Sequence, residues 1–178
     1  MEPQDIIELF RERNTSESRD RVVRTLVEQN ADLKDYFHIL YEEYPVGMMF
    51  TWMLGALTER APEMMRPLLP DFFAARLEVD ILGYDRSLSK WFSICGIPVE
   101  IEGEVTDQLF EWLMDPKVKV APKVFSMTAL ANLAQKYPEL GFELRTIIEE
   151  QMPEGSAGYK SRGRKVLKQL DEIAPRRM

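Results

Sequence analysis

The feature that most constrains this chain is a boundary that returns at a nearly constant interval. It is an apolar, aromatic or small residue followed by proline, at Ala61-Pro62, Ile97-Pro98, Tyr137-Pro138 and Ala174-Pro175. The intervals are 36, 40 and 37 residues, and each is long enough for two α-helices with their turns. A period of this length that holds two helices is typical of an α-solenoid, in which helix pairs stack in a row.

The hydrophobic pattern between these boundaries is helical nearly everywhere. Apolar residues return every three or four positions, as one face of an α-helix requires, and proline, glycine and short Thr/Ser runs separate the stripes. The pattern predicts ten helices, at about 4–13, 18–29, 31–43, 46–60, 63–78, 85–96, 104–114, 120–136, 139–152 and 157–173.

Local features of these helices give finer expectations. Asn30 is a candidate N-cap for the helix at 31–43, because its amide oxygen can accept from an unpaired N–H group. Pro67 and Pro70 should kink or delay the helix at 63–78, which begins near Pro62. The segment 99–105 alternates apolar and polar residues, yet it has no strand to pair with, so we expect an extended entry into the next helix.

The helix at 46–60 is apolar nearly all round, with Met48, Phe50, Trp52 and Leu54 spread over its surface. Such a helix has to be covered on most sides. The helix at 4–13 is mostly charged, which suits the outer end of a finite stack. The sequence therefore predicts helix pairs that bury apolar surface against their neighbours.

At this point the residues resemble those of a known family. Asp115-Pro116-Lys117-Val118, followed by 123–130 with its Ala and Leu residues, is similar to the core of a HEAT repeat. The resemblance implies a HEAT-like, armadillo-type fold: a right-handed α-α superhelix of about five antiparallel helix pairs. One domain over 1–178 would hold pairs at 4–29, 31–60, 63–96, 104–136 and 139–173. An ordinary antiparallel helix bundle is the alternative.

The resemblance also implies roles for particular residues. In such families an Asp and a basic residue brace adjacent turns, which corresponds here to Asp115 and Lys123, and more loosely to Asp85 and Arg162. The second helices of HEAT pairs line the concave side, where partners bind.

The residue inventory argues against most catalytic sites. The chain has one cysteine and one histidine, so it has no disulfide of its own and no multi-histidine metal site. His38 and Cys95 lie in different helix pairs, and Cys95 follows an apolar stripe with Trp91 and Phe92. The carboxylate groups Glu42/Glu43, Glu149/Glu150 and Glu100/Glu102/Glu104 fit a solvated acidic face. With no nucleotide-binding or hydrolase motif, we expect no cofactor and no enzymatic activity.

The net charge and the absence of targeting patterns argue against nucleic-acid and membrane partners. The formal net charge of −7 argues against a general nucleic-acid binder. The N-terminus lacks a basic and apolar leader, and the longest uncharged run, at 44–58, is too short and too broken for a membrane helix. We therefore expect a cytoplasmic protein without a membrane span, as a monomer or a weak dimer.

The C-terminal region is the one strongly basic part of the chain. Residues 160–178 hold seven cations and two carboxylates, a net charge of +5, which leaves −12 for the remaining residues. Lys160, Arg164 and Lys168 are spaced i, i+4, i+8, along one helical face. This strip is either an anion-binding surface or a solvated cap on the last helix.

Three hypotheses follow. The first is a protein-interaction scaffold whose second helices face a partner with an acidic segment, through Arg24, Lys90, Lys123, Lys160, Arg164 and Lys168. The second is a nucleic-acid-binding protein, since some solenoids of this type resemble alkylated-base glycosylases; Trp52, Trp91 and Asp80 would take the lesion-binding roles. The third is a regulatory subunit with an aromatic surface buried in a dimer. Tyr36, Phe37, Tyr41 and Tyr44 are either such a surface or the interface between helix pairs.

Overall fold

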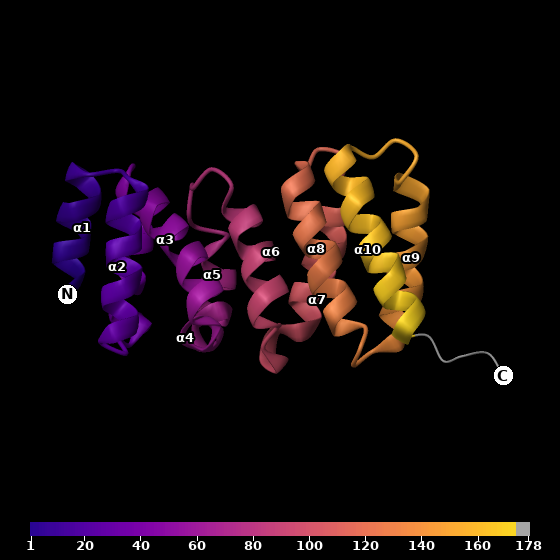
Figure 1. Ribbon diagram of the computed structural model, residues 1–178, viewed down its shortest axis with the longest axis horizontal. Helices are drawn as coiled ribbons and strands as arrows, with labels where there is room; N and C mark the ends of the chain where they lie inside the picture. Colours follow the sequence, from indigo (N-terminus) through magenta and orange to yellow (C-terminus); the bar gives the residue numbers. More distant parts are fainter. Residues whose placement is uncertain (174–178) are drawn as a thin grey trace. The chain divides into compact units, whose positions relative to one another are not determined.

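The computed structural model describes residues 1–173 of the chain (Figure 1). Within this range the chain forms ten α-helices and three short 3₁₀ helices and contains no β-strand. The prediction of an all-α fold is confirmed. The contacts between residues divide the chain into two compact units, Met1–Cys95 and Gly96–Met178. The last boundary in the sequence repeat, Ala174-Pro175, lies outside the described residues.

The N-terminal unit consists of α1 (Pro3–Glu12), α2 (Ser16–Glu28), η1 (Leu33–Tyr41), α3 (Val46–Arg60), α4 (Pro62–Met65), η2 (Arg66–Leu68), α5 (Leu69–Ala75) and α6 (Tyr84–Cys95). The C-terminal unit consists of η3 (Val99–Ile101), α7 (Glu102–Met114), α8 (Val120–Leu133), α9 (Pro138–Gln151) and α10 (Ala157–Ile173). No helix within residues 1–173 combines the length and the apolar character needed to cross a membrane.

Helix α3 is the centre of the N-terminal unit. It contacts α1, α2, η1, α4 and α6, and Met49, Phe50, Met53, Leu54 and Leu57 are fully buried. Together with Thr51 and Thr58, which are also buried, these residues occupy more than half of the helix circumference at 3.6 residues per turn, so one neighbour could not cover them all. The prediction that this helix is covered on most sides is confirmed. Trp52 is the exception, with 45% of its surface exposed.

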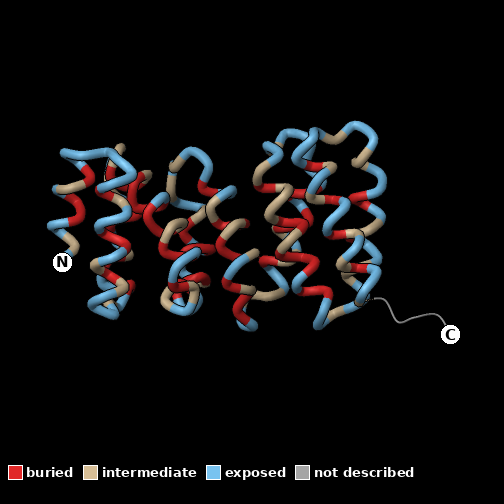
Figure 2. The backbone as a smooth tube through the Cα atoms, in the orientation of Figure 1, coloured by how far each residue is buried: buried red, intermediate tan, exposed pale blue. Residues whose placement is uncertain are grey.

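Helix α8 has the same place in the C-terminal unit. It contacts α7, α9 and α10, and Met127, Leu130 and Ala131 are fully buried. In both units the buried positions lie where helices face one another, and the outward positions are exposed (Figure 2). Each unit therefore has one apolar helix around which the others pack.

Polar side chains join neighbouring helix pairs at separations close to the sequence period. In the C-terminal unit, Arg162 donates from Nη1 to Thr128 Oγ1 at 3.1 Å, across 34 residues. Gln151 donates from Nε2 to the carbonyl oxygen of Leu113 at 3.2 Å, across 38 residues. Equivalent positions of consecutive pairs thus lie side by side, which is the translational arrangement of a solenoid.

The segment at 31–43 is not the α-helix that the pattern predicted. It forms the 3₁₀ helix η1, in which Leu33, Tyr36 and Ile39 are buried at intervals of three residues. Three residues per turn is the 3₁₀ period, so these side chains line up on one edge. The predicted cap is also wrong, because Asp32 accepts from the N–H of Lys34. Asn30 has a left-handed φ of 45° and ends α2, as Asn commonly can.

Two further expectations have different outcomes. The kink at Pro67 and Pro70 is confirmed, since the predicted helix is divided into α4, η2 and α5. The extended entry at 99–105 is wrong, because 99–101 form η3 and α7 begins at Glu102. Val99 is 70% exposed whereas Val105 is buried, so the alternation does not mark one buried face.

We predict that Leu54→Ala lowers the free energy of unfolding by about 2–5 kcal/mol, because it leaves a cavity at the centre of the N-terminal unit. The matched control is Leu77→Ala, which removes the same atoms from a side chain that is 79% exposed and should change stability by less than about 0.5 kcal/mol. Urea denaturation followed by far-ultraviolet circular dichroism measures both. Equal losses in the two variants would contradict the central position of α3.

Candidate functional site

The N-terminal unit has a hollow on the surface formed by the second helices of its pairs, α2, α3 and α6. Its volume is about 350 Å³, and its lining comes from Arg19 of α2, from 48–59 of α3, from the loop 81–83 and from 86–91 of α6. Neighbouring second helices pack directly on each other here, α2 on α3 and α3 on α6. The hollow therefore lies on the face from which HEAT-type pairs are expected to bind partners.

An aromatic platform forms one side of this hollow. The guanidinium carbon of Arg19 lies 4.3 Å from the ring centroid of Trp52, within the range of a cation–π interaction. Asp20 positions this guanidinium, because its Oδ1 accepts from Arg19 Nε at 2.8 Å and from Nη2 at 2.6 Å. The arrangement keeps a cation and an indole together at the entrance.

The second indole lies beneath the floor. Trp91 is fully buried and packs against the rings of Phe72 at 5.3 Å and Tyr84 at 5.9 Å. Its Nε1 finds no hydrogen-bond acceptor among residues 1–173, which costs about 1–3 kcal/mol. A Cβ atom on Gly55 would be 3.9 Å from this nitrogen. Because Gly55 has no side chain, it places no side-chain atom between the indole N–H and the hollow.

Cations outnumber carboxylates in the lining, with Arg19, Arg86 and Lys90 against Glu59. Lys90 Nζ lies 2.6 Å from Glu59 Oε1, whereas Arg86 forms no ion pair with any described residue. Arg86 and Lys90 are i, i+4 neighbours on α6, so both cations project from the same side of that helix. Because Asp20 pairs with Arg19 and Glu59 pairs with Lys90, the excess positive charge at the hollow is that of Arg86. The hollow is thus locally cationic in a chain with a net charge of −7, and it can receive an anionic group.

The structure brings some of the proposed partner-binding residues to this site and leaves others elsewhere. Lys90 lines the hollow, whereas Arg24 is exposed on α2 outside the lining. Lys123 is half-buried on α8, and burial lowers its pKa, while the charge of Asp115 opposes that shift. Lys160, Arg164 and Lys168 lie along α10, the first half-buried and the others exposed. The basic residues Arg176 and Arg177 lie outside the described residues.

The bracing roles that the resemblance implied are distributed differently. Asp115 Oδ1 accepts from the backbone N–H of Lys117 at 2.8 Å and so shapes the turn before α8. It forms no ion pair with Lys123 among the described residues. Arg162 does connect α10 to α8, through Thr128.

The residues considered for base recognition are divided between two hollows. Trp52 and Trp91 line the hollow described above, but Asp80 lines a neighbouring one. Glu59 is the carboxylate beside the indoles, and Lys90 holds it. The arrangement needed for the nucleic-acid alternative is therefore incomplete at this site.

One member of each candidate carboxylate group has a structural contact. Glu42 pairs with Arg11 at 3.4 Å and Glu149 with Arg145 at 3.4 Å. Glu102 accepts from Lys136 Nζ and from the Tyr137 hydroxyl, and these hydrogen bonds lower its pKa. No group of three or more His, Cys, Asp or Glu side chains within residues 1–173 is arranged to hold a metal ion.

The run of tyrosine and phenylalanine at 36–44 is partly interior and partly surface. Tyr36 is buried, and Phe37 packs against Phe72 with ring centroids 5.1 Å apart, so these two residues join η1 to the neighbouring pair. Tyr41 is 48% exposed and Tyr44 is 78% exposed. The Tyr41 hydroxyl also donates to Glu78 of the neighbouring pair at 3.2 Å. The expectation of an interface between helix pairs therefore holds for Tyr36, Phe37 and part of Tyr41, and not for Tyr44.

Comparison with protein families finds one matching description, a HEAT repeat domain that covers residues 8–170. The chain belongs to the HEAT repeat family. Neither the comparison with curated proteins nor the comparison with solved structures finds a match. The family assignment agrees with the helix pairs, the near-constant period and the hydrogen bonds across one period.

We predict that Cys95 reacts slowly with Ellman's reagent in the folded protein. Burial raises the pKa of its thiol to about 11, and the thiolate is the reactive form. Labelling at neutral pH should become fast when guanidinium chloride unfolds the chain. Fast labelling of the folded protein would show that the C-terminal end of α6 is open to solvent.

We also predict that Gly55→Ala raises the melting temperature. The added methyl group meets Trp91 Nε1 at an ordinary contact distance of 3.9 Å, and alanine stabilises a helix interior by up to about 1 kcal/mol relative to glycine. Differential scanning calorimetry measures the change. A lower melting temperature would mean that the space above Trp91 is needed for folding.

Proposed function

We propose that this HEAT repeat protein is a non-enzymatic interaction scaffold, and that its second helices bind an acidic segment of a partner protein. Repeat scaffolds of this family typically mediate protein interactions. The observation that carries the proposal is the cationic hollow between α2, α3 and α6, where Arg19, Arg86 and Lys90 surround an exposed indole.

The chemistry of the hollow suits a carboxylate-bearing segment. Arg86 presents a planar set of donors that can bind a carboxylate in two places, and Trp52 offers a broad apolar contact next to it. Lys90 is held by Glu59, so it becomes available when an incoming carboxylate competes for it. An acidic side chain next to an aromatic or aliphatic one would use all three groups.

The strip Lys160, Arg164 and Lys168 on α10 offers a second cationic surface for the same class of partner. These cations form no ion pair with any described residue, so ligand carboxylates do not have to displace an internal partner. Arg24 on α2 and Lys123 on α8 would add longer-range attraction. We propose a monomer or a weak dimer in the cytoplasm as the working form.

The test uses a fluorescein-labelled peptide that contains Asp and Glu around one aromatic residue, with fluorescence anisotropy as the measurement. We expect the double variant Arg86→Glu/Lys90→Glu to weaken binding at least about tenfold. The double variant Arg21→Glu/Lys34→Glu makes the same charge change at exposed sites outside the hollow and should alter affinity by less than about threefold. Equal losses of affinity in both double variants would mean that the net charge of the protein, and not the hollow, determines binding.

Glu59→Gln provides a test in the opposite direction. Removal of this carboxylate frees Lys90, so the peptide should bind about twofold to fivefold more tightly. The triple variant Lys160→Glu/Arg164→Glu/Lys168→Glu measures how much the α10 strip contributes to the affinity for the peptide. Unchanged affinity in every variant would overturn the proposal.

Nucleic-acid binding is the second candidate, favoured by the presence of Trp52 and Trp91 in one hollow. A titration with short DNA at low salt separates the two functions. Binding tighter than micromolar with a steep salt dependence would indicate contacts with several phosphates and would replace the acidic-segment proposal.

A further inference from the structure

A second hollow of the N-terminal unit has the opposite electrostatic character. Its volume is about 480 Å³, and it lies between the end of η1 with the turn before α3, residues 40–44, and the segment 78–82 before α6. We call it the tyrosine–carboxylate groove. Met48, Ile81 and Leu82 line both this groove and the cationic hollow, so the two sites adjoin at these residues.

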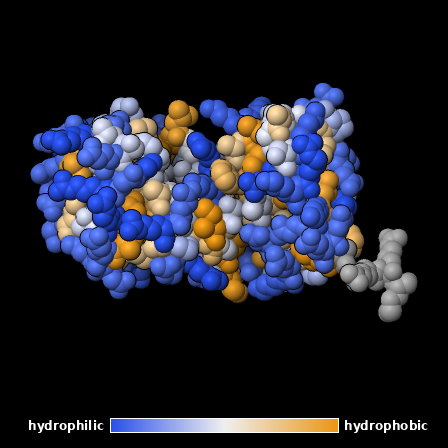
Figure 3. All heavy atoms as spheres, viewed as in Figure 1, coloured by the Kyte–Doolittle hydropathy of each residue, from blue (hydrophilic) through white to orange (hydrophobic). Residues whose placement is uncertain are grey.

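Large apolar groups are left in water around the groove. Leu82 is 88% exposed, Tyr44 is 78% exposed and Tyr41 is 48% exposed. The buried side chain of Leu40 and the half-buried side chain of Val79 complete the apolar lining. Figure 3 shows hydrophobic atoms gathered over the loop between α5 and α6. An apolar surface of this kind with a polar rim is typical of a protein-binding site.

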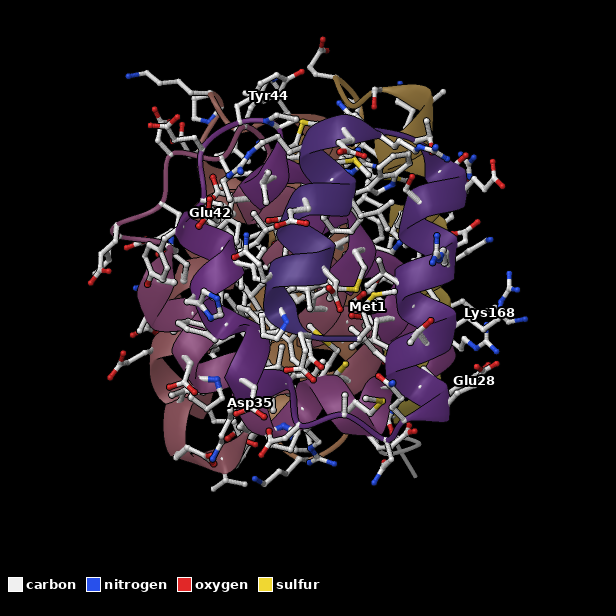
Figure 4. The ribbon with its side chains drawn as sticks, turned by 90° about the vertical axis from the view of Figure 1, so that its left-hand side faces the viewer. Met1, Glu28, Asp35, Glu42, Tyr44 and Lys168 are labelled. Carbon is white, nitrogen blue, oxygen red and sulfur yellow. The ribbon has the colours of Figure 1, made fainter. Side chains whose placement is uncertain are left out.

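The rim of the groove is entirely acidic. Glu42, Glu43, Glu78 and Asp80 belong to its lining, which contains no Lys, Arg or His. Figure 4 shows Glu42 and Tyr44 at the same side of the N-terminal end, with Tyr44 at the outer edge. Four carboxylates around an apolar floor repel a polyanion and attract a cation.

The internal contacts leave most of this negative charge available. The Tyr41 hydroxyl donates to Glu78 Oε2 at 3.2 Å, which fixes a carboxylate beside an exposed ring. Glu42 pairs with Arg11 at 3.4 Å. Glu43 and Asp80 form no ion pair with any described residue. A ligand cation between Tyr41 and Glu78 would meet both a carboxylate and an aromatic ring, and either contact stabilises a guanidinium.

We propose that the tyrosine–carboxylate groove is a docking site for a partner-protein segment that carries a large apolar side chain flanked by lysine or arginine. The apolar side chain enters between Tyr41, Tyr44 and Leu82, and the flanking cations reach Glu43, Glu78 and Asp80. The volume accommodates one or two large side chains. The site differs from the acidic-segment site in the charge that it attracts, although Met48, Ile81 and Leu82 line both hollows.

The test uses three fluorescein-labelled peptides and fluorescence anisotropy. The first carries leucines flanked by arginine and lysine, the second has the same cations with the leucines changed to serine, and the third has the same leucines flanked by glutamate. We expect the first peptide to bind at least about tenfold more tightly than either control. Equal affinity for the first two peptides would mean that charge attraction alone explains the binding, and it would overturn the proposal.

Variants of the full chain locate the site. Leu82→Ser and the double variant Glu78→Lys/Asp80→Lys should each lower the affinity for the first peptide at least about tenfold. The matched controls are Leu77→Ser, a leucine that is 79% exposed outside the groove lining, and Glu17→Lys/Glu28→Lys on α2. These controls should change affinity by less than about threefold. All exchanged residues are exposed, and circular dichroism confirms that each variant is folded.

Two other outcomes would overturn the proposal. Light scattering that shows a dimer dispersed by Leu82→Ser would mean that a second copy of the chain occupies the groove. Tight binding of the glutamate-flanked peptide that is lost in Arg86→Glu/Lys90→Glu would place the interaction at the cationic hollow, because these two cations line that hollow and not the groove. The tests of the two proposals use different peptides and different variants. Failure of the acidic-segment proposal would therefore leave the result at this groove unchanged.

Discussion

The described structure depends on helix pairs that cannot cover their own apolar surface, as α3 and α8 illustrate. Helix α3 is buried on sides that η1, its partner in the pair, does not reach, and α2 and α6 cover those sides. Helix α8 stands in the same relation to α7, α9 and α10. The burial of large side chains stabilises by about 1.5–3 kcal/mol each, so the stacking contacts carry much of the stability. The fold is therefore a succession of pairs, and its binding surfaces follow the same succession.

The stacking also explains where the candidate sites lie. Second helices pack side by side, so the cations of α6 and the indole of α3 meet at a shared surface although they are far apart in sequence. The segment between α5 and α6 contributes Ile81 and Leu82 to both the cationic hollow and the tyrosine–carboxylate groove. Two surfaces of opposite charge thus adjoin at one short segment. Partners of opposite charge would use different charged side chains there, and both would contact Met48, Ile81 and Leu82.

Much of the fold could be predicted from the sequence because the apolar stripes and prolines act locally. The prediction for α3 matches the observed bounds at both ends, and the proline break between α4 and α5 was expected from ring geometry. The segment 31–43 differs from the expected α-helix. Its buried Leu40 fits an α-helical stripe with Leu33 and Tyr36, but three of its buried positions, Leu33, Tyr36 and Ile39, follow a period of three. That period competes closely with the period of 3.6 over so few residues.

The site was harder to predict because its groups come from separate pairs. Lys90 was identified from its place on a second helix, but Arg19 and Arg86 were not. The i, i+4 spacing of Arg86 and Lys90 was a usable signal, whereas the contact of Arg19 with Trp52 depends on the packing of α2 against α3. Local charge then matters more than net charge, because interactions beyond about 8–10 Å are screened at physiological salt. An acidic chain can therefore hold a cationic site. Repulsion between the net negative charge and an acidic partner slows association, and the close contacts at the site slow dissociation of that partner.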